Sequence, residues 1–324
     1  MYSNYQKHLS EWGNFDVDDV VIEALSRLNA PVWRRQRLYD GFDYIIVDEM
    51  HLFNRNEQSV FHYLTRDFNL KDIPICFAID YAQAFGDYGE TENDYAFNGF
   101  GSSINNSLAT VFRNSPEIAD FCAAIAASGT LMFQTDFVNP YNDYVQTAFT
   151  TSDEKKCLPP SLFMYPDEES MLDGLKKQLE CIHKTVQCKA NDIAIIVFDD
   201  KYSNDDFARM LSKKIDKNIA FIDNSMDVMK CEGYVLLTPY GINGLEFKGV
   251  ILLGVDEGRV PQITGVSEIS QHYVRYMAFN QLYLASSRAK YALSIMGSSV
   301  NGKSSCLEHA IENEKINVED MIIR

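Results

Sequence analysis

Two adjacent carboxylates at the end of an apolar segment are the residues of this chain whose types and spacing most directly suggest chemistry. Residues 44–49 read YIIVDE, so Asp48 and Glu49 follow four apolar or aromatic residues. In many nucleotide hydrolases such a strand ends in an Asp that binds Mg²⁺ and a Glu that activates the attacking water. The sequence therefore predicts half of a phosphoryl-transfer site, with Asp48 as metal ligand and Glu49 as catalytic residue.

The other half of such a site, a glycine-rich loop that holds the phosphates, is not found where it is expected. That loop normally lies well upstream of the carboxylate strand, but only 43 residues precede Tyr44 and none forms a Gly-Lys pair. A literal match to the loop pattern, GSSVNGKS, occurs instead at 297–304. It has two interpretations, a phosphate loop or an ordinary loop before a C-terminal helix. We favour the second, because only 20 residues follow it.

Composition limits the class of protein. The 324 residues carry a formal net charge of −17, which argues against a protein whose main task is to coat nucleic acid. The seven cysteines form no CxxC pair, which favours reduced thiols in a cytoplasmic protein over a disulfide or zinc framework. No apolar run approaches the ~20 residues that cross a bilayer. We therefore expect a cytoplasmic protein without a membrane partner.

Hydrophobic periodicity predicts an α/β protein. Residues 1–43 have helical spacing, and apolar segments at 44–47 and 75–79 predict buried strands. A helix is expected to begin at Ser115-Pro116-Glu117 and to end at Gly129. The second half alternates strands with amphipathic helices, which is typical of a mostly parallel sheet. We expect strands at 162–165, 193–198, 219–222, 234–238, 250–254 and 292–296, and helices near 168–184, 204–215 and 270–289.

Four further segments follow the Asp48-Glu49 strand in a specific order. They are AIDYAQ at 78–83, VFRNSPEI at 111–118, TPYGINGLEFKGVILL at 238–253 and QLYLASSRAKYALSI at 281–295. In this order the five segments resemble the motifs of the UvrD/Rep/PcrA group of superfamily 1 DNA helicases. The resemblance covers nearly the whole chain, and its most specific parts are GLEF at 244–247 and LYLASSRAK at 282–290.

The resemblance implies a fold of two RecA-like parallel-sheet domains, the first incomplete at its N-terminal side. We expect the first domain at 1–128, a connector at 129–160, where the periodicity fades, and the second domain at 161–324. It also implies ATP and Mg²⁺ as cofactors, bound between the two domains.

The resemblance assigns roles to residues on both sides of that nucleotide. Gln83 matches the residue that senses the γ-phosphate. Arg113 and Arg288 match two arginine fingers that reach the phosphates, a catalytic role. Gly244 and Glu246 match residues that bind the nucleotide near its ribose. Taken singly, without the order of the motifs, these residues are better explained as capping and ion-pair residues.

Two residues are implied on the DNA side. Tyr88 falls where the helicase group often has an aromatic residue that stacks on a base, and Thr238 begins a motif that contacts the DNA strand. The chain also departs from the pattern, since Asn243 replaces a Lys, Gly89 replaces an Arg and His51 replaces a Gln. The first two changes remove positive charge, which weakens the expected coupling to DNA.

Two main functions remain open at this stage. The chain is a portion or subunit of a UvrD-like helicase that moves along or unwinds DNA with ATP, in DNA repair or antiphage defence, and takes its phosphate loop from another segment or chain. Alternatively, it is an inactive pseudo-helicase that serves as a platform for a nuclease-type partner. A sensor that binds single strands without ATP is a weaker third option.

Overall fold

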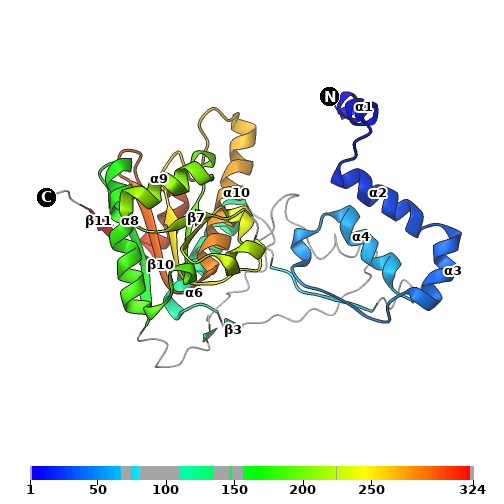
Figure 1. Ribbon diagram of the computed structural model, residues 1–324, viewed down its shortest axis with the longest axis horizontal. Coiled ribbons are helices and arrows are strands. Elements are labelled where there is room, and N and C mark those ends of the chain that lie inside the picture. The colour runs from blue at the N-terminus through cyan, green and yellow to red at the C-terminus, as the bar shows by residue number, and fades with distance from the viewer. Residues whose placement is uncertain are drawn as a thin grey trace. The chain divides into compact units, whose positions relative to one another are not determined.

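The computed structural model describes residues 2–66, 74–80, 110–111, 113–133, 146–147, 156–223 and 225–321 (Figure 1). The chain forms two compact units, Met1–Asn106 and Ser107–Arg324, called here the N-terminal and C-terminal units. The helix that begins at Pro116 belongs to the C-terminal unit. Much of the expected connector at 129–160 lies outside the described residues, so the domain bounds inferred from the sequence stay a prediction.

The N-terminal unit begins with the helices that periodicity predicts. They are α1 (Tyr2–Trp12), α2 (Val17–Leu28) and α3 (Pro31–Asp40). Asp16 starts α2 through a capping box with Asp19, and Pro31 starts α3 at the position where a missing N–H costs nothing. None of the described residues of α2 is buried, so its apolar residues contribute little to a core in this unit.

Two short parallel strands follow. β1 (Ile45–Val47) pairs with β2 (Ile75–Phe77), and α4 (Arg55–Leu64) lies between them in sequence. Asn54 caps α4 by accepting the backbone N–H groups of Asn56 and Glu57. The inner face of the strands packs on Phe53 and on Phe61 of α4, around the buried side chains of Val47 and Met50. This arrangement positions Asp48 and Glu49 directly beyond β1.

The C-terminal unit is built on one parallel sheet with the strand order β11-β5-β10-β9-β6-β8-β7. Its strands are β5 (Leu158–Tyr165), β6 (Ile193–Val197), β7 (Ile219–Phe221), β8 (Tyr234–Leu237), β9 (Phe247–Leu253), β10 (Ala289–Ser298) and β11 (Asn317–Asp320). β9 and β6 are central and are apolar at nearly every position, as expected for strands that are buried on both faces. The expected α/β class is confirmed, and the sheet is compatible with a RecA-like domain.

Helices cover both faces of this sheet (Figure 1). One face packs on α8 (Glu168–Ile182) and α9 (Asp205–Ile215), and the other on α6 (Pro116–Phe133) and α10 (Glu268–Ser287), with α11 (Glu308–Glu312) beside α6. Ile193, Ile195 and Val197 join α8 and α9 in one core, whereas Ala194 and Ile196 are equally buried on the opposite face. The alternation follows from the period of two residues in a strand.

Three short strands were not expected from the sequence. β11 adds a parallel strand beside β5 near the C-terminus, and β3 (Thr110–Val111) pairs with β4 (Gln146–Thr147). Each has four residues or fewer, too few for a periodicity to be recognised. Within the described residues, no helix is long and apolar enough to cross a membrane.

Candidate functional site

The carboxylate pair lies at the carboxyl end of β1, where ligands of open α/β sheets bind. Asp48 is exposed, and its Oδ1 accepts the backbone N–H of Glu49 at 3.0 Å. Glu49 has a φ of 53°, in the left-handed region, and caps the short helix η1 (Met50–Leu52). A left-handed backbone is costly for a residue with a side chain and often marks a functional position.

His51 holds Glu49 in place. Its imidazole is almost completely buried, with 2 % of the side chain exposed, and its Nε2 lies 3.1 Å from a carboxylate oxygen of Glu49. On the other side of the ring, Nδ1 accepts the backbone N–H of Asp80 at 3.1 Å. Since a backbone N–H only donates, Nδ1 carries the lone pair and Nε2 carries the proton. His51 therefore donates to Glu49 and links it to the end of β2.

This role of His51 was not visible in the sequence. The residue differs from the Gln that the resemblance leads one to expect, and a lone His carries no pattern of its own. A Gln also has one donor and one acceptor, so both residue types are able to connect a carboxylate with a backbone N–H. The replacement of Gln by His thus keeps the hydrogen-bonding chemistry of the position.

The carboxylate pair fits a magnesium ion only together with a phosphate. Among the described residues, no group of three or more His, Cys, Asp or Glu side chains is arranged to hold a metal ion. Mg²⁺ usually keeps several waters and is bound through one or two carboxylates plus the substrate phosphates. An exposed Asp48 suits this mode of binding.

The C-terminal unit brings several other predicted residues together. Arg113 Nε lies 3.2 Å from a carboxylate oxygen of Glu246, and both side chains are partly exposed. The next residue, Asn114, is buried and donates from Nδ2 to the carbonyls of Ser287 and Ala289, which flank Arg288. No pattern in the sequence indicates this role of Asn114. Its two hydrogen bonds fix the segment that carries Arg113 against the junction of α10 and β10.

Arg288 is a buried member of this cluster. Arg288 is only 1 % exposed. Its guanidinium donates to the carbonyls of Leu284 and Leu245 at 3.3 and 3.4 Å. Its own carbonyl accepts the N–H of Phe247 at 2.9 Å. Arg288 thereby ties the turn at Gly244, which has a φ of 72°, to the end of α10. Its role as an arginine finger stays a prediction.

The remaining predicted residues lie apart from this cluster or outside the described chain. Thr238 follows the carboxyl end of β8, whereas Gly244 and Glu246 precede the amino end of β9. Because all strands of this sheet are parallel, these are opposite edges. Gln83 and Tyr88 lie outside the described residues.

The segment that matches the phosphate-loop pattern folds around a carboxylate of the protein. The backbone N–H of Ser298 donates to Asp256 at 2.8 Å, and that of Ser299 donates to the carbonyl of Tyr165. A side chain at Gly297 would meet the carbonyl of Val255 at 2.6 Å, and Gly302 has a φ of 84°. The fold of the loop itself thus explains why glycine occupies both positions. The N–H groups of Ser298 and Ser299 are already used within the protein, which supports the interpretation as an ordinary loop.

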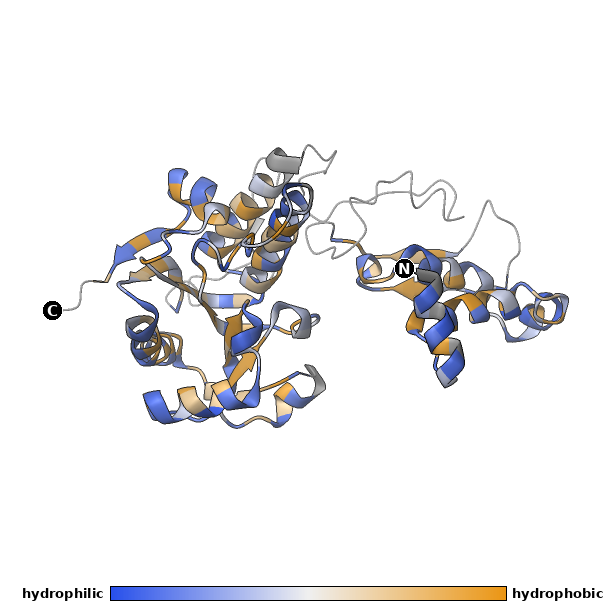
Figure 2. Cartoon of the chain, turned by 90° about the horizontal axis from the view of Figure 1, so that it is seen from above, coloured by the Kyte–Doolittle hydropathy of each residue, from blue (hydrophilic) through white to orange (hydrophobic). Residues whose placement is uncertain are grey.

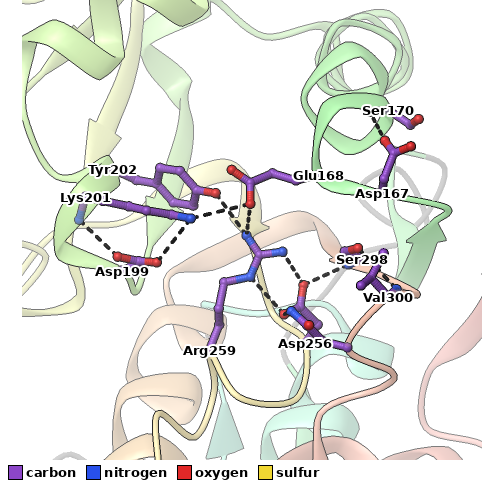
Figure 3. A network of polar contacts seen from close by, with 11 residues as sticks. Asp167, Glu168, Ser170, Asp199, Lys201, Tyr202, Asp256, Arg259, Ser298 and Val300 are labelled. Atoms are coloured by element: carbon purple, nitrogen blue, oxygen red, sulfur yellow. Dashed lines mark hydrogen bonds and ion pairs between the residues drawn. The ribbon is translucent and has the colours of Figure 1, made fainter. Parts of the chain in front are cut away.

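Asp256 is the centre of a polar network at the carboxyl ends of β5, β6, β9 and β10 (Figure 3). Its carboxylate is fully buried and accepts Nε and Nη2 of Arg259, besides Ser298 and the amide of Asn301. Arg259 Nη1 donates to Tyr202 at 3.0 Å and reaches Glu168 at 3.4 Å. Burial and the neighbouring Glu168 raise the pKa of Tyr202 to about 12. The network joins four strand ends.

Acidification is expected to destabilise the C-terminal unit through its carboxylate pairs. Burial acts to raise the pKa of Asp192. The hydrogen bond from the Lys189 N–H and the ion pair with Lys248 together have the larger effect, so the pKa of Asp192 is lowered. A group with a lowered folded pKa contributes stability above the ordinary carboxyl value, about 4, and this contribution is lost as the pH falls through the folded pKa. We expect the urea midpoint to fall as the pH is lowered below about 5.

The variant Lys248→Met isolates this contribution. It removes the partner of Asp192 from an exposed site of β9, so its urea midpoint should depend less on pH than that of the unchanged chain. An identical pH dependence of the two proteins would show that the pair contributes nothing.

Comparisons with known proteins show little. No family model matches the chain, and no curated protein matches its sequence. Among solved structures, the chain is similar to the crystal structure of the C-terminal domain of a possible DNA helicase from Lactobacillus plantarum WCFS1, at 18 % identity and a TM-score of 0.41. The match covers 64 % of this chain and 98 % of that chain. At these values the similarity carries no argument about activity.

Proposed function

We propose that this chain is a portion or subunit of a UvrD-like superfamily 1 helicase, whose role is ATP-driven movement along DNA or its unwinding. The observation that carries the proposal is the order of the five motif segments between residues 44 and 295. Contacts among the segments that carry Arg113, Glu246 and Arg288 support it, because these segments are three of the five motifs. The phosphate loop comes from another segment or chain.

In this proposal the residues of the N-terminal unit do the chemistry on water. Asp48 binds the Mg²⁺ that accompanies ATP, which neutralises charge on the phosphates. Glu49 orients and deprotonates the attacking water, and His51 holds the Glu49 carboxylate in position by donating from Nε2. Gln83 senses the γ-phosphate, and the arginine fingers Arg113 and Arg288 reach the phosphates. Gly244 and Glu246 bind the nucleotide near its ribose. On the DNA side, the contacts come from Tyr88 and Thr238.

Two observations favour a second candidate function. The guanidinium of Arg288 is buried and donates to backbone carbonyls within its own unit, and Asn243 stands where the helicase group has a Lys. Both suit an inactive pseudo-helicase that serves as a platform for a nuclease-type partner. In that case Arg288 is a structural residue only.

The decisive experiment is DNA-stimulated ATP hydrolysis. The chain is produced together with the polypeptide encoded immediately upstream, and phosphate release is measured with and without single-stranded DNA. We expect hydrolysis that requires both components and rises with DNA. The isolated chain serves as the control and should be inactive. An inert mixture whose upstream component has no phosphate loop would contradict the proposal and favour the platform.

A further inference from the structure

Asn243 and Gly244 are the two central residues of a turn in the C-terminal unit. The backbone N–H of Leu245 donates to the carbonyl of Ile242 at 3.1 Å, which closes the turn. The turn lies between β8 and β9, whose mostly apolar residues are buried in the sheet (Figure 2). Asn followed by Gly is typical of turns. It is also the pair in which a backbone nitrogen most easily reaches the preceding side-chain amide, because Gly has no Cβ.

The contacts around this pair are few. In the part of the chain that the structure describes, neither the side-chain amide of Asn243 nor the N–H of Gly244 makes a hydrogen bond. Gly244 is exposed, and a Cβ built on it would have no atom within 4 Å. The peptide between the two residues therefore rotates once the single hydrogen bond of the turn opens. That rotation brings the Gly244 nitrogen toward the amide carbon of Asn243.

A second Asn-Gly pair of the same unit, Asn301-Gly302, is held in place. Gly302 also has a positive φ, of 84°, and open space where a Cβ would lie. However, the amide of Asn301 donates to the buried carboxylate of Asp256 at 3.1 Å. The carbonyl of Gly302 accepts the N–H of Glu257, also at 3.1 Å. The two pairs thus have the same residue types and differ in the contacts that hold them.

We propose that Asn243 is a site of spontaneous deamidation in the folded chain, and that its contacts protect Asn301 from the same reaction. The nitrogen of Gly244 attacks the side-chain carbonyl carbon of Asn243, and the new C–N bond closes a cyclic succinimide. The side-chain nitrogen leaves as ammonia, with the proton of the Gly244 N–H. Water then opens the ring at either carbonyl and gives aspartate or isoaspartate. The net change exchanges an amide and a water for a carboxylate and ammonia, so the reaction needs no oxidant or cofactor.

Either product alters a turn that contacts two arginines of the motif segments. The new negative charge lies three residues before Glu246, whose carboxylate pairs with Arg113. Isoaspartate also adds a methylene group to the main chain, ahead of the Leu245 carbonyl that accepts the guanidinium of Arg288. The charge opposes the binding of phosphates nearby, and the longer backbone loosens the contact with Arg288. A loss of ATP hydrolysis with age follows, and this consequence, unlike the deamidation itself, rests on the proposed function.

Peptide mapping of the full chain tests the proposal. The chain is kept at neutral pH and physiological temperature for several days and is then cut with trypsin. Peptides 231–248 and 291–303 contain Asn243 and Asn301 as their only Asn residues, so mass spectrometry reports each site separately. Labelling with an isoaspartate methyltransferase identifies the second product. We expect conversion at Asn243 to be about tenfold or more faster, because Asn301 must first lose a hydrogen bond to a charged group.

Incubation in concentrated urea is the control for the effect of structure. Unfolding frees both pairs, so the two rates should become similar. Equal rates in the folded chain, or faster conversion at Asn301, would overturn the proposal. A ratio in urea as large as in the folded chain would overturn the protection of Asn301. The third Asn-Gly pair, at 98–99, lies outside the described residues and in another tryptic peptide, so it does not disturb the comparison.

Ageing before the ATP-hydrolysis experiment separates the modification from the proposed function. Asn243→Gln, aged in parallel, is the matched control, because Gln keeps the amide but would have to form a larger ring. Activity that falls with the isoaspartate content at Asn243, and persists in the variant, supports the consequence. Activity that survives full conversion contradicts the consequence alone. An inert mixture with fresh chain contradicts the proposed function, while peptide mapping still decides on the deamidation.

Discussion

Replacing Asp256 with Ala is expected to lower the free energy of unfolding of the C-terminal unit by about 3–5 kcal/mol. The carboxylate is fully buried and accepts four hydrogen bonds, two of them from Arg259. Its removal leaves the Arg259 guanidinium, in a side chain only 10 % exposed, without its main counter-charge. It also frees the N–H of Ser298, so the loop that follows β10 loses its support.

Urea denaturation followed by circular dichroism measures this loss. Both tryptophans, Trp12 and Trp33, lie in the N-terminal unit, so fluorescence would report on the wrong unit. Asp206→Ala is the matched control, because Asp206 pairs with Arg209 on the surface and its loss should be barely measurable. A double variant, Asp256→Leu with Arg259→Met, should recover part of the stability by removing both charges. An effect of Asp256→Ala as small as that of the control would contradict the importance of the network.

Glu49→Gln is expected to reduce the rate of ATP hydrolysis by the reconstituted enzyme by about 10²–10⁴-fold, the usual contribution of a general base. The amide has the shape of the carboxylate but takes no proton from water. Since Asp48 and not Glu49 is assigned to the metal, binding of MgATP should survive. Steady-state hydrolysis and nucleotide binding are measured on the same preparation, with the exposed Glu23→Gln as control.

Variants of His51 separate positioning from folding. His51→Gln keeps one donor for Glu49 and one acceptor for the N–H of Asp80, so it should retain most of the activity. His51→Ala loses both hydrogen bonds and should lower the rate while MgATP still binds.

Full activity of Glu49→Gln would contradict the role of Glu49. Equal activity of the two His51 variants would contradict the positioning role of His51.

The sequence by itself determined the fold class and the longer elements, although α6 ends at Phe133 and not at Gly129 as expected. The apolar run at 193–198 predicts β6 because a strand buried on both faces has no polar alternation, and β6 spans Ile193–Val197. Ser115 and Pro116 predict the start of α6, since a cap and a fixed φ act within one turn of the helix. These signals are local, so a single sequence is enough to recognise them.

Only the tertiary structure decided which side chains meet. Thr238 and Glu246 are close in sequence, but Thr238 follows the carboxyl end of β8 and Glu246 precedes the amino end of β9. Because both strands run parallel to β6, the two residues lie at opposite edges of the sheet. His51 contacts Glu49 and Asp80, and Asn114 contacts both neighbours of Arg288, without any sequence pattern. The GSSVNGKS segment has the letters of a phosphate loop, yet Asp256, more than forty residues away, accepts its amide. Such contacts depend on strand order and burial, which no local spacing encodes.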